Sequence, residues 1–341
     1  MDCISKCHSS TIPIDSDEAL VEDHKQLYYD AQIDAALSTI NWDPVHSGIN
    51  QFLQAACEVG FTRFELNHQI PPEVFEQIDF DTFCFNSLHN PCPAIIPMKQ
   101  LEIEDRLLTS LDEKSRQSGM DVLKNTIETA RLLGARLVVI HSGWVTGGDA
   151  MDRTLRSLYL EGKENTPEYA QLKAKMIADR SERGKPHLQS LMKSFWEIIE
   201  FTGDCNLMLG IENLLHYYEM PNFNEMSQIL EEFKQPWFGW QLDTGHIQVQ
   251  QNLGLESFLY WLEQFAGRMV GIHLHDVMGL KDHLAPGLGK VDFAAIAPNI
   301  PPHAQRTLEV KPFVTPAEIT GSLPILEKSG CLAKFKKYWR R

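Results

Sequence analysis

The stretch "SGMDVLKNTIETARLLGARLVVIHSG", residues 118–143, combines the two patterns from which most of the chain is built. Its first part has apolar residues three and four positions apart, which is typical of a helix lying against a core. Its second part contains "RLVVI" (136–140), a short β-rich run that the polar residues "HSG" follow directly. The stretch therefore predicts a helix that leads into a buried strand with His141 at its end.

Short β-rich runs of this kind recur along the chain with helical segments between them. They lie at residues 33–40, 62–66, 82–88, 136–140, 207–212, 237–242, 270–275 and 306–310. The alternation predicts parallel strands joined by helical crossovers, and eight such units make a closed (β/α)8 barrel. The rival, a doubly wound open sheet, predicts a glycine-rich turn after the first strand, which "INWDPVHSGIN" (40–50) lacks.

The predicted fold class is therefore α/β, with a single (β/α)8 TIM barrel over residues 31–330. An N-terminal extension (1–30) precedes the barrel, and a basic C-terminal tail (331–341) follows it. Long loops are expected after strands three and four, over 89–135 and 142–206. In the second of these we expect a loop over the barrel mouth at 145–165, then two helices broken near Gly184 and Pro186.

Composition limits the class of protein. The chain has 341 residues, 43% of them apolar, and a formal net charge of −15, which disfavours nucleic acid as a partner. It shows neither a signal peptide nor a run of about 18 apolar residues that could span a membrane. Its seven cysteines are scattered, as in reduced proteins, so we expect a cytoplasmic location. Homo-oligomerisation remains open.

The segment "GWQLDTGHIQ" (239–248) places Asp243 and His246 at the end of an apolar run. Residues three apart in a strand point to opposite faces, so the two share a target only if the chain turns between them. Gly245 permits such a turn. We therefore expect a strand that ends in a loop at the C-terminal mouth of the barrel, where barrel enzymes hold their active sites.

Other predicted strands also end in acidic or imidazole side chains. These residues are His89, His141, Glu212, His273 and Glu309. One such residue alone is explained by a structural ion pair, but several carboxylates at one rim repel one another unless a divalent cation holds them. Imidazole and carboxylate ligands suit transition metals better than Ca²⁺, without distinguishing Mn²⁺, Zn²⁺, Co²⁺, Fe²⁺ or Mg²⁺.

The segment "DVMGLKDHLAPGLGKVDF" (276–293) adds further candidates. His283, with Asp282 beside it, is a candidate ligand for metal or substrate. Gly287 and Gly289 let backbone amides approach an anionic group, and Lys281 lies where barrels often bind phosphate. These three residues are therefore candidates for phosphate binding.

Seven fragments together resemble the sugar phosphate isomerase/epimerase family of xylose isomerase-like barrels. They are "SLHNP", "LLGARLVVIHSG", "LGIENL", "LDTGHIQ", "GIHLHD", "HLAPGLGKVDF" and "LEVKP". The resemblance runs over residues 33–328. The resemblance implies a divalent metal held by Glu212, Asp243, His273 and Glu309. It also implies that Glu212 and Glu309 are the acid and base of an isomerase or epimerase that works through a metal-stabilised enediolate. His246 would then orient a substrate hydroxyl.

The same superfamily contains apurinic-site endonucleases, which offer an alternative. The chain resembles them at His89, His141, His246 and His283, which match residues that bind additional zinc ions there. Against a zinc-dependent phosphodiesterase, Lys281 stands where those nucleases have an aspartate, and the predicted mouth loops contain few cations for a DNA backbone.

The sequence thus predicts an isomerase or epimerase of a small polyhydroxylated substrate, namely a sugar, a sugar phosphate or a cyclitol-like ketone. A dehydratase would use the same enolate. A barrel that binds sugar without catalysis is the remaining alternative, because fold alone does not fix a reaction.

Overall fold

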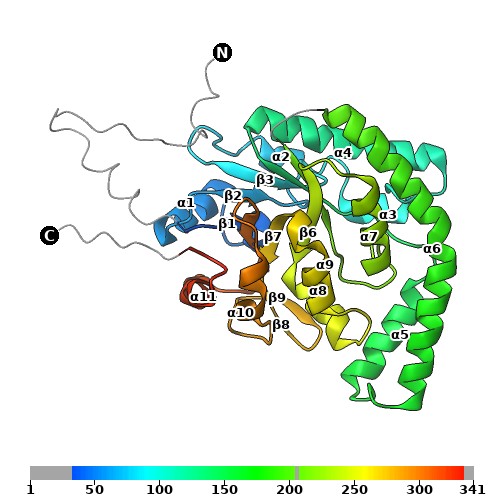
Figure 1. Cartoon of the computed structure of the whole chain (residues 1–341). Helices are drawn as coiled ribbons and strands as arrows, with labels where there is room; N and C mark the ends of the chain where they lie inside the picture. The colour runs from blue at the N-terminus through cyan, green and yellow to red at the C-terminus, as the bar shows by residue number, and fades with distance from the viewer. Residues whose placement is uncertain (1–32, 204–206, 334–341) are drawn as a thin grey trace, which may run out of the picture.

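The computed structural model describes residues 33–203 and 207–333, and its centre is a closed barrel of eight parallel strands (Figure 1). The strands are β1 (Ala36–Ser38), β2 (Phe64–Leu66), β3 (Phe85–His89), β4 (Leu137–Ile140), β5 (Met208–Glu212), β6 (Phe238–Asp243), β7 (Met269–Leu274) and β10 (Gln305–Leu308). Strand β10 pairs with β7 on one side and with β1 on the other, which closes the barrel. The predicted TIM barrel is confirmed, with a strand in each predicted run.

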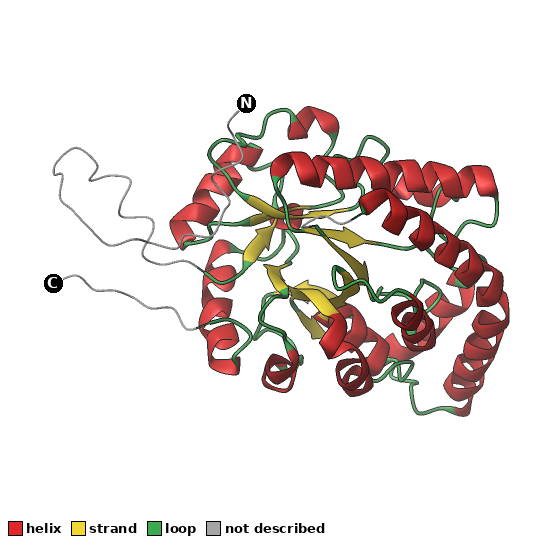
Figure 2. Ribbon diagram, turned by 45° about the horizontal axis from the view of Figure 1, so that its top comes forward, coloured by secondary structure: helices red, strands yellow, loops and turns green. Residues whose placement is uncertain are grey.

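Helices surround the barrel on its outer face (Figure 2). They are α1 (Ile49–Val59), α2 (Pro72–Phe75), α3 (Met98–Ile103), α4 (Glu113–Leu133), α5 (Asp149–Leu160), α6 (Pro167–Thr202), α7 (Phe223–Glu232), α8 (Thr244–Asn252), α9 (Phe258–Phe265), α10 (Phe293–Ile296) and α11 (Pro316–Ser329). A small antiparallel hairpin of β8 (Asp276–Met278) and β9 (Lys281–Leu284) follows β7. Within the described ranges, no helix combines the length and apolar character that a membrane span requires.

Helix α4 and strand β4 show why this sequence folds locally as it does. The Asp112 side chain accepts a hydrogen bond from the backbone of Ser115 and so caps the start of α4. Gly134 ends the helix in the left-handed conformation, with φ of 67°, which glycine adopts without steric cost. Leu123 and Ile127 are buried on one face of the helix, and all of β4 is buried behind it.

The long connection after β4 differs from the prediction in two ways. Most of the expected loop at 145–165 is helix α5, and α6 is one continuous helix of 36 residues that passes through Pro186. A proline inside a helix costs about 3 kcal/mol because it removes a hydrogen bond. Contacts on both sides of Pro186 offset that cost, since Arg180 pairs with Glu225 and the His187 ring donates to the Thr109 carbonyl at 2.8 Å.

The predicted N-terminal extension (1–30) and most of the predicted basic tail, 334–341, lie outside the described residues.

Candidate metal centre

Four of the predicted ligands meet at the C-terminal ends of the barrel strands. Glu212 and Asp243 are the last residues of β5 and β6, His273 lies near the end of β7, and Glu309 directly follows β10. All four are buried, and one ligand atom of each lies within 4.8 Å of the other three. We call these four residues the central group.

The atoms of the central group point toward a common space. The Nδ1 atom of His273 lies 2.9 Å from Glu309 Oε2, 3.4 Å from Glu212 Oε1 and 3.7 Å from Asp243 Oδ2. Both His273 Nδ1 and Glu212 Oε1 are buried without a hydrogen bond from any described residue. Buried polar atoms are normally satisfied, and these carboxylates have no lysine or arginine partner within the described ranges. The donor set therefore fits a divalent cation.

Carboxylates and imidazoles in the centre shift one another's pKa. Burial raises the pKa of Glu212, but the His141 and His273 imidazoles outweigh burial and hold that pKa well below its ordinary value. Burial likewise raises the pKa of Glu309, and His273 more than reverses this effect. Burial lowers the pKa of His273, yet the Glu309 and Glu65 carboxylates raise it well above its ordinary value. The centre thus holds several anions whose charge is offset by imidazoles.

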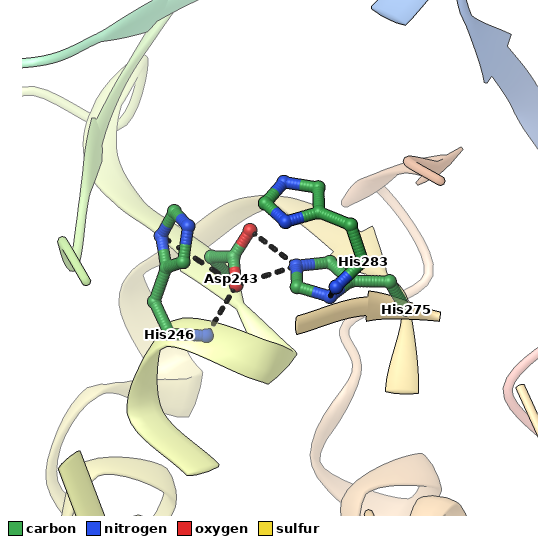
Figure 3. A group of neighbouring side chains, drawn as sticks. All are labelled: Asp243, His246, His275 and His283. Atoms are coloured by element: carbon green, nitrogen blue, oxygen red, sulfur yellow. Dashed lines mark hydrogen bonds and ion pairs between the residues drawn. The ribbon is translucent and has the colours of Figure 1, made fainter. Parts of the chain in front are cut away.

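A second group of ligand type adjoins the first and shares Asp243 with it (Figure 3). Asp243 caps helix α8, because its Oδ1 accepts a hydrogen bond of 2.7 Å from the His246 backbone. The Nε2 atom of His275 lies 2.8 and 2.9 Å from the two Asp243 oxygens, and the His283 backbone donates to His275 Nδ1 at 2.9 Å. His283 has a φ of 54°, a conformation that costs free energy outside glycine. We call Asp243, His246, His275 and His283 the hairpin group.

The predicted role of Gly245 is wrong. No loop separates Asp243 from His246, since α8 begins at Thr244 directly after β6. A Cβ atom on Gly245 would lie 2.0 Å from Cε1 of the His275 ring. Glycine is needed here for the close approach of that ring.

A third group consists of His89, His141 and Glu212. The Nε2 atoms of His89 and His141 lie 3.1 and 2.9 Å from Glu212 Oε2. The ring of His68 lies beside them, with its centroid 4.8 Å from that of His89 and 5.7 Å from that of His141. Burial, followed by the charges of His89 and His141, lowers the pKa of His68 well below its ordinary value.

The residues predicted to bind phosphate do not form an anion site together. The amides of Gly287 and Gly289 donate to Asp276 Oδ2 at 2.8 and 2.9 Å, so the anion that they meet belongs to the chain itself. Lys281 is exposed, and its Nζ lies 4.6 Å from the ring centroid of Phe313. The prediction for these two amides is therefore wrong, because a partner within the same segment already uses them.

Asp282, predicted as a ligand for metal or substrate, pairs with its neighbours instead. Its Oδ2 lies 2.9 Å from His283 Nδ1, and its Oδ1 accepts a hydrogen bond of 3.3 Å from Lys311 Nζ. Burial lowers the pKa of His283, but Asp282 and Glu309 outweigh burial and raise it to about 9. Asp282 thus contacts Nδ1 of the His283 ring and can fix the orientation of that ring.

Two site residues, His68 and His275, escaped the sequence analysis. His275 stands two positions after His273, so strand periodicity would have placed both on one face. His68 stands two positions after the end of β2, close to the kind of strand end that singled out the other candidates.

Fold and site together define a (β/α)8 barrel with a buried cluster of imidazoles and carboxylates at its C-terminal mouth. A family model described as "Xylose isomerase-like TIM barrel" matches residues 53–300. The chain therefore belongs to this family.

The chain is similar to a curated protein in sequence and to solved structures in fold. Uncharacterized protein y4fM of Sinorhizobium fredii is 26% identical over 282 residues, which cover 80% of this chain and 76% of the relative. The crystal structure of a D-tagatose 3-epimerase-like protein is similar with a TM-score of 0.59 at 16% identity, covering 86% of this chain and 96% of that one. The structure of the IOLI protein with a binding zinc atom has a TM-score of 0.56 at 14% identity and covers 86% and 95%. At these identities the two structures show a common fold.

Proposed function

We propose that the protein is a divalent-metal-dependent isomerase or epimerase of a small polyhydroxylated substrate. The observation that supports this most directly is the convergence of two buried glutamates, Glu212 and Glu309, on the space that Asp243 and His273 also face. The similar structures named for an epimerase and for bound zinc agree with this chemistry.

In the proposed reaction the two glutamates move a proton. A divalent cation held by the central group would polarise the carbonyl and hydroxyl oxygens of the substrate and so lower the free energy of an enediolate. One of Glu212 and Glu309 removes the proton from the carbon beside the carbonyl, and the other returns it. Return to the opposite face of the carbon gives an epimer, and return to the neighbouring carbon gives an isomer.

His246 is suited to orient a substrate hydroxyl. Its Nδ1 lies 3.1 Å from the Asn213 carbonyl oxygen and donates to it, because a carbonyl can only accept. This leaves Nε2 of His246 as an acceptor for a hydroxyl group. Because the Gly287 and Gly289 amides bind Asp276, the proposal favours an unphosphorylated sugar or cyclitol-like ketone over a sugar phosphate. A cytoplasmic location remains part of the proposal.

A second candidate function is hydrolysis of a phosphodiester by several metal ions. The observation that favours it is that the third group and the hairpin group flank the central group and share Glu212 and Asp243 with it. Shared carboxylates are suited to bridge neighbouring ions, which can activate water against a phosphodiester. His275 supplies an imidazole to the hairpin group although the aspartate expected at Lys281 is missing.

One experiment separates these functions. Protein purified without chelator is analysed for metal content and incubated in heavy water with a panel of ketoses and cyclitol ketones. We expect one tightly bound ion per chain and exchange of a carbon-bound hydrogen. No exchange on the whole panel by metal-loaded protein would exclude the isomerase. Nicking of an abasic duplex with two or three bound ions would support hydrolysis, and sugar binding that Glu212→Gln leaves unchanged, without exchange, would indicate a non-catalytic barrel.

A further inference from the structure

A fourth carboxyl group inside the barrel faces His273, at the ring nitrogen opposite to the one that faces the central group. This residue is Glu65 on β2, and neither Glu65 nor His273 is accessible to solvent. The Nε2 atom of His273 lies 3.2 Å from Glu65 Oε2. The hydroxyl groups of Ser87 and Thr307 donate to the same oxygen at 2.8 and 3.5 Å.

Within the described ranges, His273 is the ionisable side chain that pairs with Glu65. Neither lysine nor arginine contacts Glu65 there. A buried carboxyl group is costly unless it is paired and hydrogen-bonded. Apolar residues of similar size would fill this position in the barrel at lower cost, so a purely structural role explains Glu65 poorly.

The two nitrogens of the His273 ring therefore have separate partners. Nε2 faces Glu65 Oε2, an oxygen that already accepts hydrogen bonds from two hydroxyl groups. A carboxylate oxygen can only accept, so Nε2 must carry the hydrogen of the bond between them. A neutral ring with its hydrogen on Nε2 has a lone pair on Nδ1. That atom is the one that faces Glu212, Asp243 and Glu309.

We propose that Glu65 is a positioning residue that fixes the ring orientation and tautomer of His273, so that Nδ1 is presented to a cation in the central group. This inference rests on the proposed metal centre. A carboxylate behind a ligating histidine makes the imidazole more basic, and loss of such a partner weakens metal affinity by about 10–100-fold. Glu65 contacts neither metal nor substrate in this arrangement.

The test compares two buried carboxyl groups that each contact one histidine. Glu65→Gln removes the charge behind His273 and keeps the size of the side chain. Asp152→Asn makes the same change at a buried aspartate whose Oδ2 lies 2.7 Å from His216 Nδ1, outside the three ligand groups. Zn²⁺ affinity is measured by competition with a chromophoric chelator, and the Co²⁺-loaded proteins are compared by absorption spectroscopy.

We expect Glu65→Gln to weaken Zn²⁺ binding by about 10–100-fold and to change the Co²⁺ spectrum, while Asp152→Asn stays within about twofold of the wild type. Equal affinity and an identical spectrum for Glu65→Gln would overturn the inference and leave the metal centre intact. If the wild type takes up no metal, or if Glu309→Gln binds as tightly as the wild type, the metal centre itself is wrong and the inference falls with it.

A measurement on the wild type keeps the inference testable if Glu65→Gln does not fold. Long-range ¹H–¹⁵N NMR of the Zn²⁺-loaded protein reports which nitrogen of His273 carries hydrogen. We expect the hydrogen on Nε2, and a hydrogen on Nδ1 would contradict the proposed orientation.

Discussion

Two regions of the molecule bury carboxylates and neutralise them in different ways. In the arginine-paired region, Arg180 on α6 contacts both oxygens of Glu225 on α7, at 2.5 and 2.7 Å. In the central group, imidazoles are the partners, and Glu212 Oε1 has no hydrogen bond from a described residue. A guanidinium keeps its charge at every physiological pH, whereas an imidazolium can release its proton to water and then coordinate a cation. The arginine pair therefore keeps its charge, whereas the central group is suited to exchange protons for a metal ion.

The arginine-paired region also supports the segment that follows the candidate metal centre. Arg180 donates to the carbonyls of Tyr217 and Glu219, both at 2.8 Å, in the loop that follows Glu212. Helix α6 thereby fixes the loop around residues 217–219, which follows Glu212 in the chain. We expect changes in this region to alter stability, and changes in the central group to alter chemistry.

The largest expected effect comes from Glu309→Gln, which removes a proposed metal ligand and one of the two proposed proton-transfer groups. Loss of a general acid or base lowers turnover by about 10²–10⁴-fold, which corresponds to roughly 3–5 kcal/mol. The rate of hydrogen exchange in heavy water under saturating metal measures it. Glu225→Gln, the same change in the arginine-paired region, should keep its activity per folded molecule, and equal rates for Glu309→Gln and the wild type would refute the assigned role.

Arg180→Met tests the structural side of the comparison. Removing one partner of a buried ion pair leaves an uncompensated charge and costs about 3–5 kcal/mol of unfolding free energy. Urea unfolding of the apo protein measures this loss. The double variant Arg180→Met with Glu225→Leu should recover part of the stability, because the buried carboxylate is gone while the bonds to the two carbonyls stay lost. A double variant as unstable as the single one would show that the unpaired charge is not the cause.

Metal removal should destabilise the protein through the central group. At a free metal concentration of about 100 Kd, binding adds roughly 2.7 kcal/mol to the unfolding free energy. Thermal unfolding with and without a chelator should show this as a lower Tm in the apo protein. In His273→Ala the chelator should have little effect, and an undiminished shift in that variant would place the ion elsewhere.

The smallest effect concerns Asp152, an intermediate case with both an arginine and an imidazole as partners. Burial raises its pKa, but His216 and Arg156 outweigh burial and lower the pKa below 3.8. A carboxyl group with a depressed pKa in the folded state stabilises the protein above its unfolded pKa, and this contribution is lost as the pH falls through the folded pKa. Asp152→Asn should therefore cost about 1.5–3 kcal/mol near pH 6, the usual contribution of a hydrogen bond to a charged group.

This difference between Asp152→Asn and the wild type should shrink as the pH falls below 3.8. Urea titrations at several pH values measure it. A difference that is constant across this range would show that the aspartate charge is not involved.

The barrel was predictable because its signals are local. Each strand run ends in polar residues and leads into a helical period, and the parallel topology then brings all strand ends to one rim. That geometry predicted a set of imidazoles and carboxylates at one rim, and the family resemblance then selected Glu212, Asp243, His273 and Glu309 from this set. The continuity of α6 could not be predicted, because the contacts of Arg180 and His187 that offset Pro186 are made with distant segments.

The details of the site depend on such pairings. Glu65 is the single acidic residue in the β-rich run "TRFEL", but its partner His273 lies 208 positions further along the chain. The glycine-rich segment predicted amides that bind the phosphate of a ligand, and this prediction was wrong. Because Asp276 lies only 11 and 13 positions before Gly287 and Gly289, the chain itself supplies the anion that these amides meet.

Asp243 serves both as the cap of α8 and as a member of two ligand groups. Its carboxylate is therefore attracted by the partial positive charge at the start of a helix as well as by any bound cation. Replacement by alanine would remove both interactions at once, whereas asparagine would preserve the cap. At this strand-to-helix junction, one carboxylate thus fixes the start of α8 and supplies an oxygen to both candidate ligand groups.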